Sequence, residues 1–147
     1  MSIFSMINVS ASGMTAERMR MDVISENIAN VETTVTENGG PYRRKTAIFQ
    51  ERKNTEFKIP FDSIEKEENK VGNGVRVIKI AEDKSPFKYK YDPNHPNANE
   101  EGYVAMPNVN IVKEMTDMIT ASRAYEANAT VITTAKGMAN AALNIGK

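Results

Sequence analysis

The chain has 147 residues, which is enough for one domain with a modest hydrophobic core. Its 19 basic and 19 acidic side chains cancel, so no net charge attracts it to nucleic acid, an anionic membrane or an acidic substrate. It has no cysteine, which excludes disulfide bonds, thiolate nucleophiles and cysteine-bound metals.

The residue types divide the chain into two ends and a middle. All six prolines and 26 of the 38 charged side chains lie in residues 31–107, and proline breaks a helix interior, so the middle is not helical. We therefore predict an α+β fold, in which two long terminal helices form an α-helical, coiled-coil-like domain and a small β-rich module is inserted between them. The expected divisions are residues 1–34, 35–107 and 108–147.

The N-terminal segment, from Ser2 or Ser5 to Asn30, carries apolar residues at seven-residue spacing, which is typical of a helix with one apolar face. Gly13 and many serine and asparagine residues lower its helix propensity, so packing must hold it. The residues that we expect on its contact face are Ile7, Met14, Met21, Ile24 and Ile28. We expect no cleaved signal peptide, because no basic region or cleavage site is found here, and no apolar run in the sequence is long enough to span a membrane.

The middle contains short β-type runs separated by glycine-containing turns. The runs are residues 42–49, 75–80 and 87–91, and the turns are residues 39–41 and 72–74. Residues 63–70 form a charged loop, and residues 92–102 form a connector rich in proline and asparagine. Lysines alternate with aromatic residues along residues 87–91, so we expect the aromatic side chains to face a core and the lysines to face water.

The C-terminal segment begins after Pro107, where Asn108 or Asn110 can cap a helix, and it runs to about Ile145. At roughly 1.5 Å per residue such a helix extends about 55 Å, which is longer than a domain of this size covers by itself. The residues that we expect on its contact face are Ile111, Met115, Met118, Tyr125, Ile132 and Leu143.

Two interpretations of these apolar faces remain open. The two helices can pack on each other as an intramolecular core, which is the commonest use of such spacing. The unequal helix lengths and the scarcity of leucine favour instead several close neighbours supplied by other subunits.

Catalytic chemistry has little support, since the chain has one histidine and no cysteine. His95 with Glu100 and Glu101 can be drawn as the metal site of a hydrolase, but a turn in which His95 caps or packs explains the same residues. Residues 42–45 and 87–91 combine cations with aromatic rings, as a nucleic-acid surface would, but the zero net charge disfavours this use. We therefore predict no enzyme activity, no cofactor, no metal and no nucleic-acid partner.

Two segments at opposite ends resemble motifs of one protein family. Residues 12–34, with the sequence SGMTAERMRMDVISENIANVETT, resemble the N-terminal motif of bacterial flagellar rod and hook proteins. Residues 102–110, with the sequence GYVAMPNVN, resemble the C-terminal motif of the same family, as do Glu114, Met115 and residues 122–128.

Two further segments, residues 39–45 and 91–99, are similar to the proximal rod proteins of this family in particular. The sequence departs from the family at Glu26 and Glu32, where relatives usually carry asparagine or another small polar residue. The resemblance is weakest across residues 54–70.

The resemblance implies a structural subunit of the rod, the periplasmic drive shaft that transmits torque to the hook, polymerised through its terminal helices into a helical polymer. The partners that it implies are rod subunits of the FlgB, FlgF and FlgG types, a FliE-type base adaptor and the flagellar type III export apparatus, without direct membrane insertion. We expect both helices to be poorly ordered in the free monomer, because an isolated helix gains little until its apolar face is buried. The alternative function is a cytoplasmic coiled-coil adaptor or export chaperone.

Overall fold

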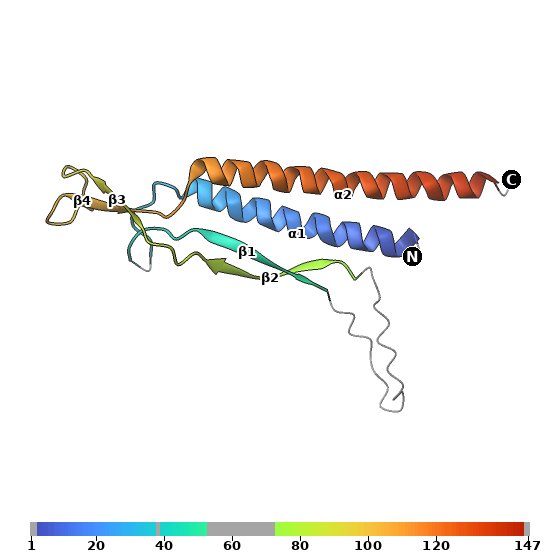
Figure 1. Cartoon of the computed structure of the whole chain (residues 1–147), viewed down its shortest axis with the longest axis horizontal. Coiled ribbons are helices and arrows are strands. Elements are labelled where there is room, and N and C mark those ends of the chain that lie inside the picture. Colours follow the sequence, from blue (N-terminus) through green and yellow to red (C-terminus); the bar gives the residue numbers. More distant parts are fainter. Residues whose placement is uncertain (1–2, 38, 53–72, 146–147) are drawn as a thin grey trace, which may run out of the picture.

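The computed structural model describes residues 3–37, 39–52 and 73–145, and these ranges contain two long helices and four short strands (Figure 1). The helices are α1, Ile3–Ala29, and α2, Ile111–Ile145. The strands are β1, Lys45–Glu51, β2, Val75–Glu82, β3, Lys88–Tyr91, and β4, Tyr103–Met106. The predicted α+β fold with a helix at each end is confirmed, whereas the charged loop expected at residues 63–70 lies outside the described residues.

The two helices lie side by side and run in opposite directions (Figure 1). Near the end of α1, Asn27 donates a hydrogen bond of 2.9 Å to Glu114 in the first turn of α2. Farther along, a Cβ atom built on Gly13 would lie 3.0 Å from the side chain of Asn128, so the two helices are in close contact here. These contacts are fourteen residues apart on α1, from 13 to 27, and fourteen on α2, from 114 to 128. The helices therefore keep one register over two heptads.

We call residues 16–29 and 111–125 the closed end of the helix pair, and residues 3–12 and 131–145 its open end. Helix α2 has 35 residues and α1 has 27, so in this register the last turns of α2 extend past the start of α1. Leu143 lies five full turns beyond Tyr125 and thus on the same side of α2, yet Leu143 is 72% exposed while Tyr125 is partly buried. The expectation that a single chain cannot cover the whole of α2 is therefore met.

The strands form two separate antiparallel ribbons. Strands β1 and β2 pair along the length of α1, with a register shift between Ile48 and Phe49. Strands β3 and β4 pair beyond the closed end of the helices (Figure 1). The runs predicted at residues 42–49, 75–80 and 87–91 correspond to β1, β2 and β3, but β4 was not predicted.

The backbone at Gly74 fixes the β1–β2 ribbon to α1. Gly74 has a φ of +79°, and a Cβ atom at this position would collide with the Oγ atom of Ser12. That hydroxyl accepts a hydrogen bond of 3.0 Å from the backbone N–H of Val75 and donates one of 2.6 Å to the carbonyl of Val9. The start of β2 is thus bonded to the side of α1 through a contact that only glycine permits.

The predicted alternation of buried aromatic residues and exposed lysines along residues 87–91 is wrong. All four residues of β3 are exposed, because the two-stranded ribbon β3–β4 has no second layer behind it. Phe87, which precedes the strand, is partly buried, and the guanidinium of Arg43 lies 4.2 Å from the centre of its ring. Tyr91 contacts Tyr103 of β4 edge to face, with ring centres 5.3 Å apart.

The buried apolar side chains larger than alanine lie at or beside the closed end. In the described residues these are Val23, Ile24, Tyr42, Val104, Pro107 and Val109. None of the described helices is long and apolar enough to cross a membrane.

Candidate assembly surface

The outward side of α2 is apolar over its first turns. The near patch consists of Ile111, Val112, Met115 and Ile119, all of them exposed. The spacing of three and four residues between Val112, Met115 and Ile119 places them on one face of the helix. The same face continues with Arg123 and Glu126, which are exposed and polar. The near patch is therefore a bounded apolar surface.

A second apolar surface surrounds the open end. This far patch consists of Phe4 of α1 with Val131, Met138, Leu143 and Ile145 of α2. Val131 follows Ile119 by twelve residues, which rotates its position around the helix by about 120°. Val131, Met138 and Ile145 therefore face a different side of α2 from the near patch, whereas Leu143 lies on the side of Tyr125.

The predicted contact residues divide into three groups. Ile111, Met115 and Leu143 are exposed and belong to these patches. Ile7, Met14, Met21, Ile28, Met118, Tyr125 and Ile132 are partly buried. Ile24 is 5% exposed and is used inside the subunit. The intramolecular interpretation therefore holds for one side of each helix, whereas contact of the exposed residues with other subunits stays a prediction.

Sequence reasoning missed several members of the patches. They are Phe4, Val112, Ile119, Val131, Met138 and Ile145. The seven-residue spacing of Val131, Met138 and Ile145 was a usable signal. It was overlooked because a parallel line of apolar residues, Met118, Tyr125 and Ile132, has the same spacing.

A buried polar cluster joins the two helices beneath these surfaces, with the amide of Asn27 at its centre. Asn27 and Glu114 are both 0% exposed. The Asn27 Nδ2 atom donates to Glu114 Oε2 at 2.9 Å and to the carbonyl of Lys45 at 2.8 Å. Its Oδ1 atom accepts from the N–H of Lys45 at 2.8 Å and from the hydroxyl of Tyr42 at 3.0 Å. The amide therefore pairs with both backbone groups of Lys45, as a neighbouring strand would.

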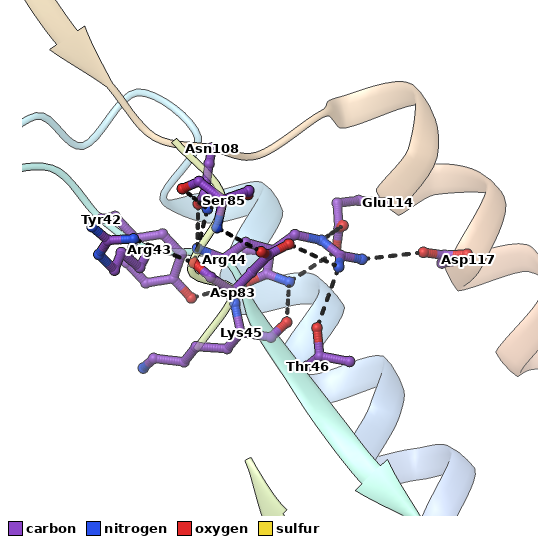
Figure 2. Close-up of polar contacts among 11 residues, drawn as sticks. Tyr42, Arg43, Arg44, Lys45, Thr46, Asp83, Ser85, Asn108, Glu114 and Asp117 are labelled. Atoms are coloured by element: carbon purple, nitrogen blue, oxygen red, sulfur yellow. Dashed lines mark hydrogen bonds and ion pairs between the residues drawn. The ribbon is translucent and has the colours of Figure 1, made fainter. Parts of the chain in front are cut away.

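Arg44 connects β1 to α2 in the same cluster, as Figure 2 shows. Its Nε atom donates to Glu114 Oε1 at 2.6 Å. Its terminal nitrogens lie 3.2 Å from the hydroxyl of Thr46, 3.4 Å from Asp117 and 3.8 Å from Asp83. Among the described residues every buried side-chain nitrogen and oxygen has a hydrogen-bond partner. The buried charge of Glu114 is thus both paired and fully hydrogen-bonded, the condition under which such burial is tolerated.

Asn108 extends the cluster toward the segment that follows β2. Its Oδ1 atom accepts from the N–H of Arg44 at 2.8 Å, and its Nδ2 atom donates to the carbonyl of Asp83 at 3.0 Å. The N–H of Ser85 donates to the Asp83 carboxylate at 2.9 Å, and this bond is the main reason that the pKa of Asp83 is lowered. The cap of α2 is instead Asn110, whose Oδ1 atom accepts from the N–H of Val112 at 3.1 Å.

Tyr42 has a strongly raised pKa. Burial, reinforced by the negative charges of Glu26, Glu114 and Glu82, raises the pKa of its hydroxyl from 10.0 to about 12. Glu26, one of the two departures from the family pattern, pairs with Lys45 at 2.6 Å. These groups hold structure together, and they do not include a nucleophile with an adjacent base.

The residues considered above as a metal site or as a nucleic-acid surface make contacts within the chain instead. His95 accepts a hydrogen bond of 3.1 Å at Nδ1 from the N–H of Asn97, as the turn interpretation expects. In the part of the chain that the structure describes, no three histidine, cysteine, aspartate or glutamate residues cluster as metal ligands would. The cations at residues 43–45 are used in internal contacts, since Arg43 covers Phe87, Arg44 binds Glu114 and Lys45 binds Glu26.

Comparisons with known proteins agree at both ends of the chain. A family model described as flagella basal body rod protein matches residues 7–35. A second, described as flagellar basal body rod FlgEFG protein C-terminal, matches residues 100–145. The first match covers most of α1, and the second covers the whole of α2.

Curated relatives extend the similarity over the whole chain. The flagellar basal-body rod protein FlgC of Borreliella burgdorferi is 55% identical over 152 aligned positions, which cover 99% of this chain and 98% of that protein. The protein of the same name from Bacillus subtilis is 48% identical over the full length of both chains. The one from Escherichia coli O157:H7 is 33% identical, again over both full lengths.

Proposed function

The chain belongs to the FlgC family of flagellar basal-body rod proteins and is a structural subunit of the rod, and on this premise we propose that the near and far patches are its contacts with neighbouring rod subunits. The observation that carries the proposal is that two apolar surfaces on different sides of α2 are uncovered in the single chain. Clusters of exposed apolar side chains commonly mark the sites where a protein binds a partner.

The direction of the two patches supports a polymer rather than a closed pair. A dimer with twofold symmetry uses one self-complementary surface, whereas a helical polymer uses different surfaces on different sides of each subunit. The near and far patches differ in position and in composition, so each meets a different neighbour. Helices packed in this way form the stiff shaft through which torque is transmitted.

The finer assignments also belong to this proposal. The neighbours are rod subunits of the FlgB, FlgF and FlgG types and a FliE-type base adaptor, and the flagellar type III export apparatus delivers the chain to the periplasm without cleavage of a signal peptide. Residues 1–34 and 108–147 form the assembly domain, and residues 35–107 form the outer module. The absence of cysteine suits a chain that must be exported unfolded, because no disulfide bond constrains it.

The test is assembly of rods from a variant with a charge in the near patch. In a strain that lacks its own copy of this protein, Met115→Asp is expected to prevent rod assembly and motility, because an unpaired carboxylate would be buried at the contact. The matched control is Thr130→Asp, which places the same charge on the polar continuation of the same helix face. Basal bodies purified from each strain and imaged by electron microscopy give the readout.

Normal rods and swimming with Met115→Asp would remove the near patch from the contact surface. Loss of rods with Thr130→Asp as well would show that any charge on α2 is harmful, and the assignment of specific patches would fail.

A further inference from the structure

We propose that a face of the β3–β4 ribbon, made of Tyr89, Tyr91 and Tyr103 and called here the tyrosine face, docks on the last turns of α2 of the next rod subunit along the long axis. Those turns, residues 139–145, are called here the overhang. This inference rests on the proposed function, since it names the surface that covers Leu143 of the far patch. The contact is head to tail, because each of the two subunits contributes a different surface.

The register of the ribbon gives it two different faces. Side chains alternate between the faces along each strand, so Tyr89, Tyr91 and Tyr103 share one face while Lys90 and Val104 share the other. Val104 is 1% exposed, so the face that carries it contacts the rest of the chain. The three tyrosines are all exposed, and their face is the one that a partner can cover.

The tyrosine face is held in place within the subunit. The rings of Tyr91 and Tyr103 contact each other edge to face. A Cβ atom built on Gly102 would lie 3.0 Å from the Cε2 atom of Tyr91, so this ring lies against the backbone of the glycine. Tyrosines fixed in this way can bury a large area at a small cost in conformational entropy, which is why they are enriched where proteins bind each other.

Helix α2 offers a gap of matching length. The register of the two helices places Ile3, the first described residue of α1, level with Met138, so the overhang extends past it. Its residues 139–145 span about 10 Å at roughly 1.5 Å per residue. Each strand of the ribbon has four residues and spans about 13 Å at roughly 3.3 Å per residue. The ribbon can therefore cover the side of the overhang that carries Leu143, where α1 does not reach.

The two surfaces lie at opposite ends of the molecule (Figure 1). The ribbon projects from the closed end of the helix pair, and the overhang lies at the end that carries both termini. A neighbour of the same fold, placed farther along the long axis in the same orientation, brings its ribbon to the overhang. A contact between two unlike surfaces can repeat from subunit to subunit, as a helical polymer requires.

The chemistry of the two surfaces also matches. The overhang contains only alanine, asparagine, leucine and isoleucine, so tyrosine rings can cover it without burying an ion. The exposed Lys136, seven residues before Leu143, places a positive charge on the same side of α2. Residues 91–106, at the ribbon, contain no lysine or arginine and three carboxylates, those of Asp92, Glu100 and Glu101. Charges of opposite sign thus meet at the border of the contact, where they stay in water and orient the encounter.

Thiol labelling of purified basal bodies tests whether the tyrosine face is covered. Tyr89→Cys and Lys90→Cys each place a single thiol on opposite faces of one strand. Relative to the free subunit, the Tyr89→Cys thiol in the basal body should react with a maleimide at least about tenfold more slowly, because the centre of an interface excludes water. The Lys90→Cys thiol should react about equally in both states.

Rapid reaction of Tyr89→Cys in the basal body, or equal protection of both thiols, would overturn the inference. Ala105→Cys reports on the same face as Tyr89, so it replaces Tyr89→Cys if loss of that ring prevents assembly.

A photoreactive benzophenone maleimide attached to Tyr89→Cys identifies what covers this face. After irradiation of purified basal bodies, mass spectrometry should find the label joined to the last turns of the C-terminal helix of a rod subunit. A label joined to another segment of a rod subunit, to a protein that is not a rod subunit, or to no protein would overturn the inference.

Failure of this inference and failure of the proposed function give different results. If Tyr89→Cys stays reactive in basal bodies in which Leu143→Cys is protected, another surface covers the far patch, so the ribbon contact is wrong and the proposed function stands. If Leu143→Cys itself stays reactive, the far patch is not a contact and both are wrong.

Discussion

At the scale of single residues, the decisive positions are polar. Asn27 and Glu114 lie within segments that resemble the family's two motifs. They are 87 residues apart in the sequence, and their pairing depends on the register in which the two helices pack. Sequence periodicity shows which side of a helix is apolar and gives no reason to expect a buried carboxylate there. This part of the structure could not have been predicted from one sequence.

Truncation of Glu114 should be costly. Glu114→Ala leaves Arg44, whose side chain is 15% exposed, without its main partner and opens a cavity beside Asn27. The expected loss in free energy of unfolding is about 3 to 5 kcal/mol, the range measured when one member of a buried ion pair is removed. Urea denaturation followed by circular dichroism measures it, and a loss below about 1 kcal/mol would contradict the assigned role.

The alkaline limit of stability should depend on Tyr42. Its pKa is about 12 in the folded chain and 10.0 when unperturbed, so the folded state retains the proton at a pH where the unfolded state loses it. This contribution is complete below pH 10 and is lost as the pH rises through 12, by about 1.4 kcal/mol per pH unit in that interval. Urea denaturation at several pH values should show a shallower alkaline decline for Tyr42→Phe. Parallel declines for the two proteins would contradict it.

Two glycines should respond oppositely to alanine. Gly74→Ala forces a side chain into a left-handed backbone conformation and against Ser12, at a cost of about 1 to 3 kcal/mol. Gly137→Ala meets no neighbour and favours the helix, so it should not lower stability. Thermal denaturation of both variants decides this, and equal destabilisation would show that the contact with Ser12 is not the cause.

At the scale of elements, the helices were the most predictable part. Seven-residue apolar spacing and the boundary signals at Pro107 and Asn110 placed both helices within a few residues of their observed limits. Strand β4 was missed because its four residues lie in a segment attributed to a motif, and its partner β3 has no buried face to give a period. A strand that has no layer packed on either face lacks the alternation of apolar and polar residues by which strands are predicted.

Two adjacent residues of α2 should separate internal packing from assembly. Met118 is partly buried, whereas Ile119 is 61% exposed. Met118→Asp should therefore lower the stability of the free subunit by several kcal/mol, and Ile119→Asp should leave it within about 0.5 kcal/mol. Chemical denaturation of the two monomers measures the difference, and equal effects would mean that the orientation of α2 is incorrect.

At the scale of the whole molecule, the single chain is an incomplete structure. Its apolar residues serve two purposes, since one set closes the helix pair and another remains uncovered in the near and far patches. The alternative of a cytoplasmic adaptor or export chaperone is not supported, because the relatives over the full length are rod proteins. Helix α2 carries two seven-residue apolar repeats that face different sides of the helix. One of these repeats alone does not reveal that α2 is apolar on more than one side.

The central claim is that neighbouring rod subunits cover both patches, and chemical labelling of single cysteines tests it most directly. The chain has no cysteine of its own, so Met115→Cys and Leu143→Cys each introduce a unique thiol, and Glu101→Cys in the connector before β4 serves as a control. In the free subunit all three thiols should react rapidly with a maleimide. In purified basal bodies, Met115→Cys and Leu143→Cys should be protected while Glu101→Cys still reacts. Equal reaction of the patch thiols in the free subunit and in the basal body would contradict the account.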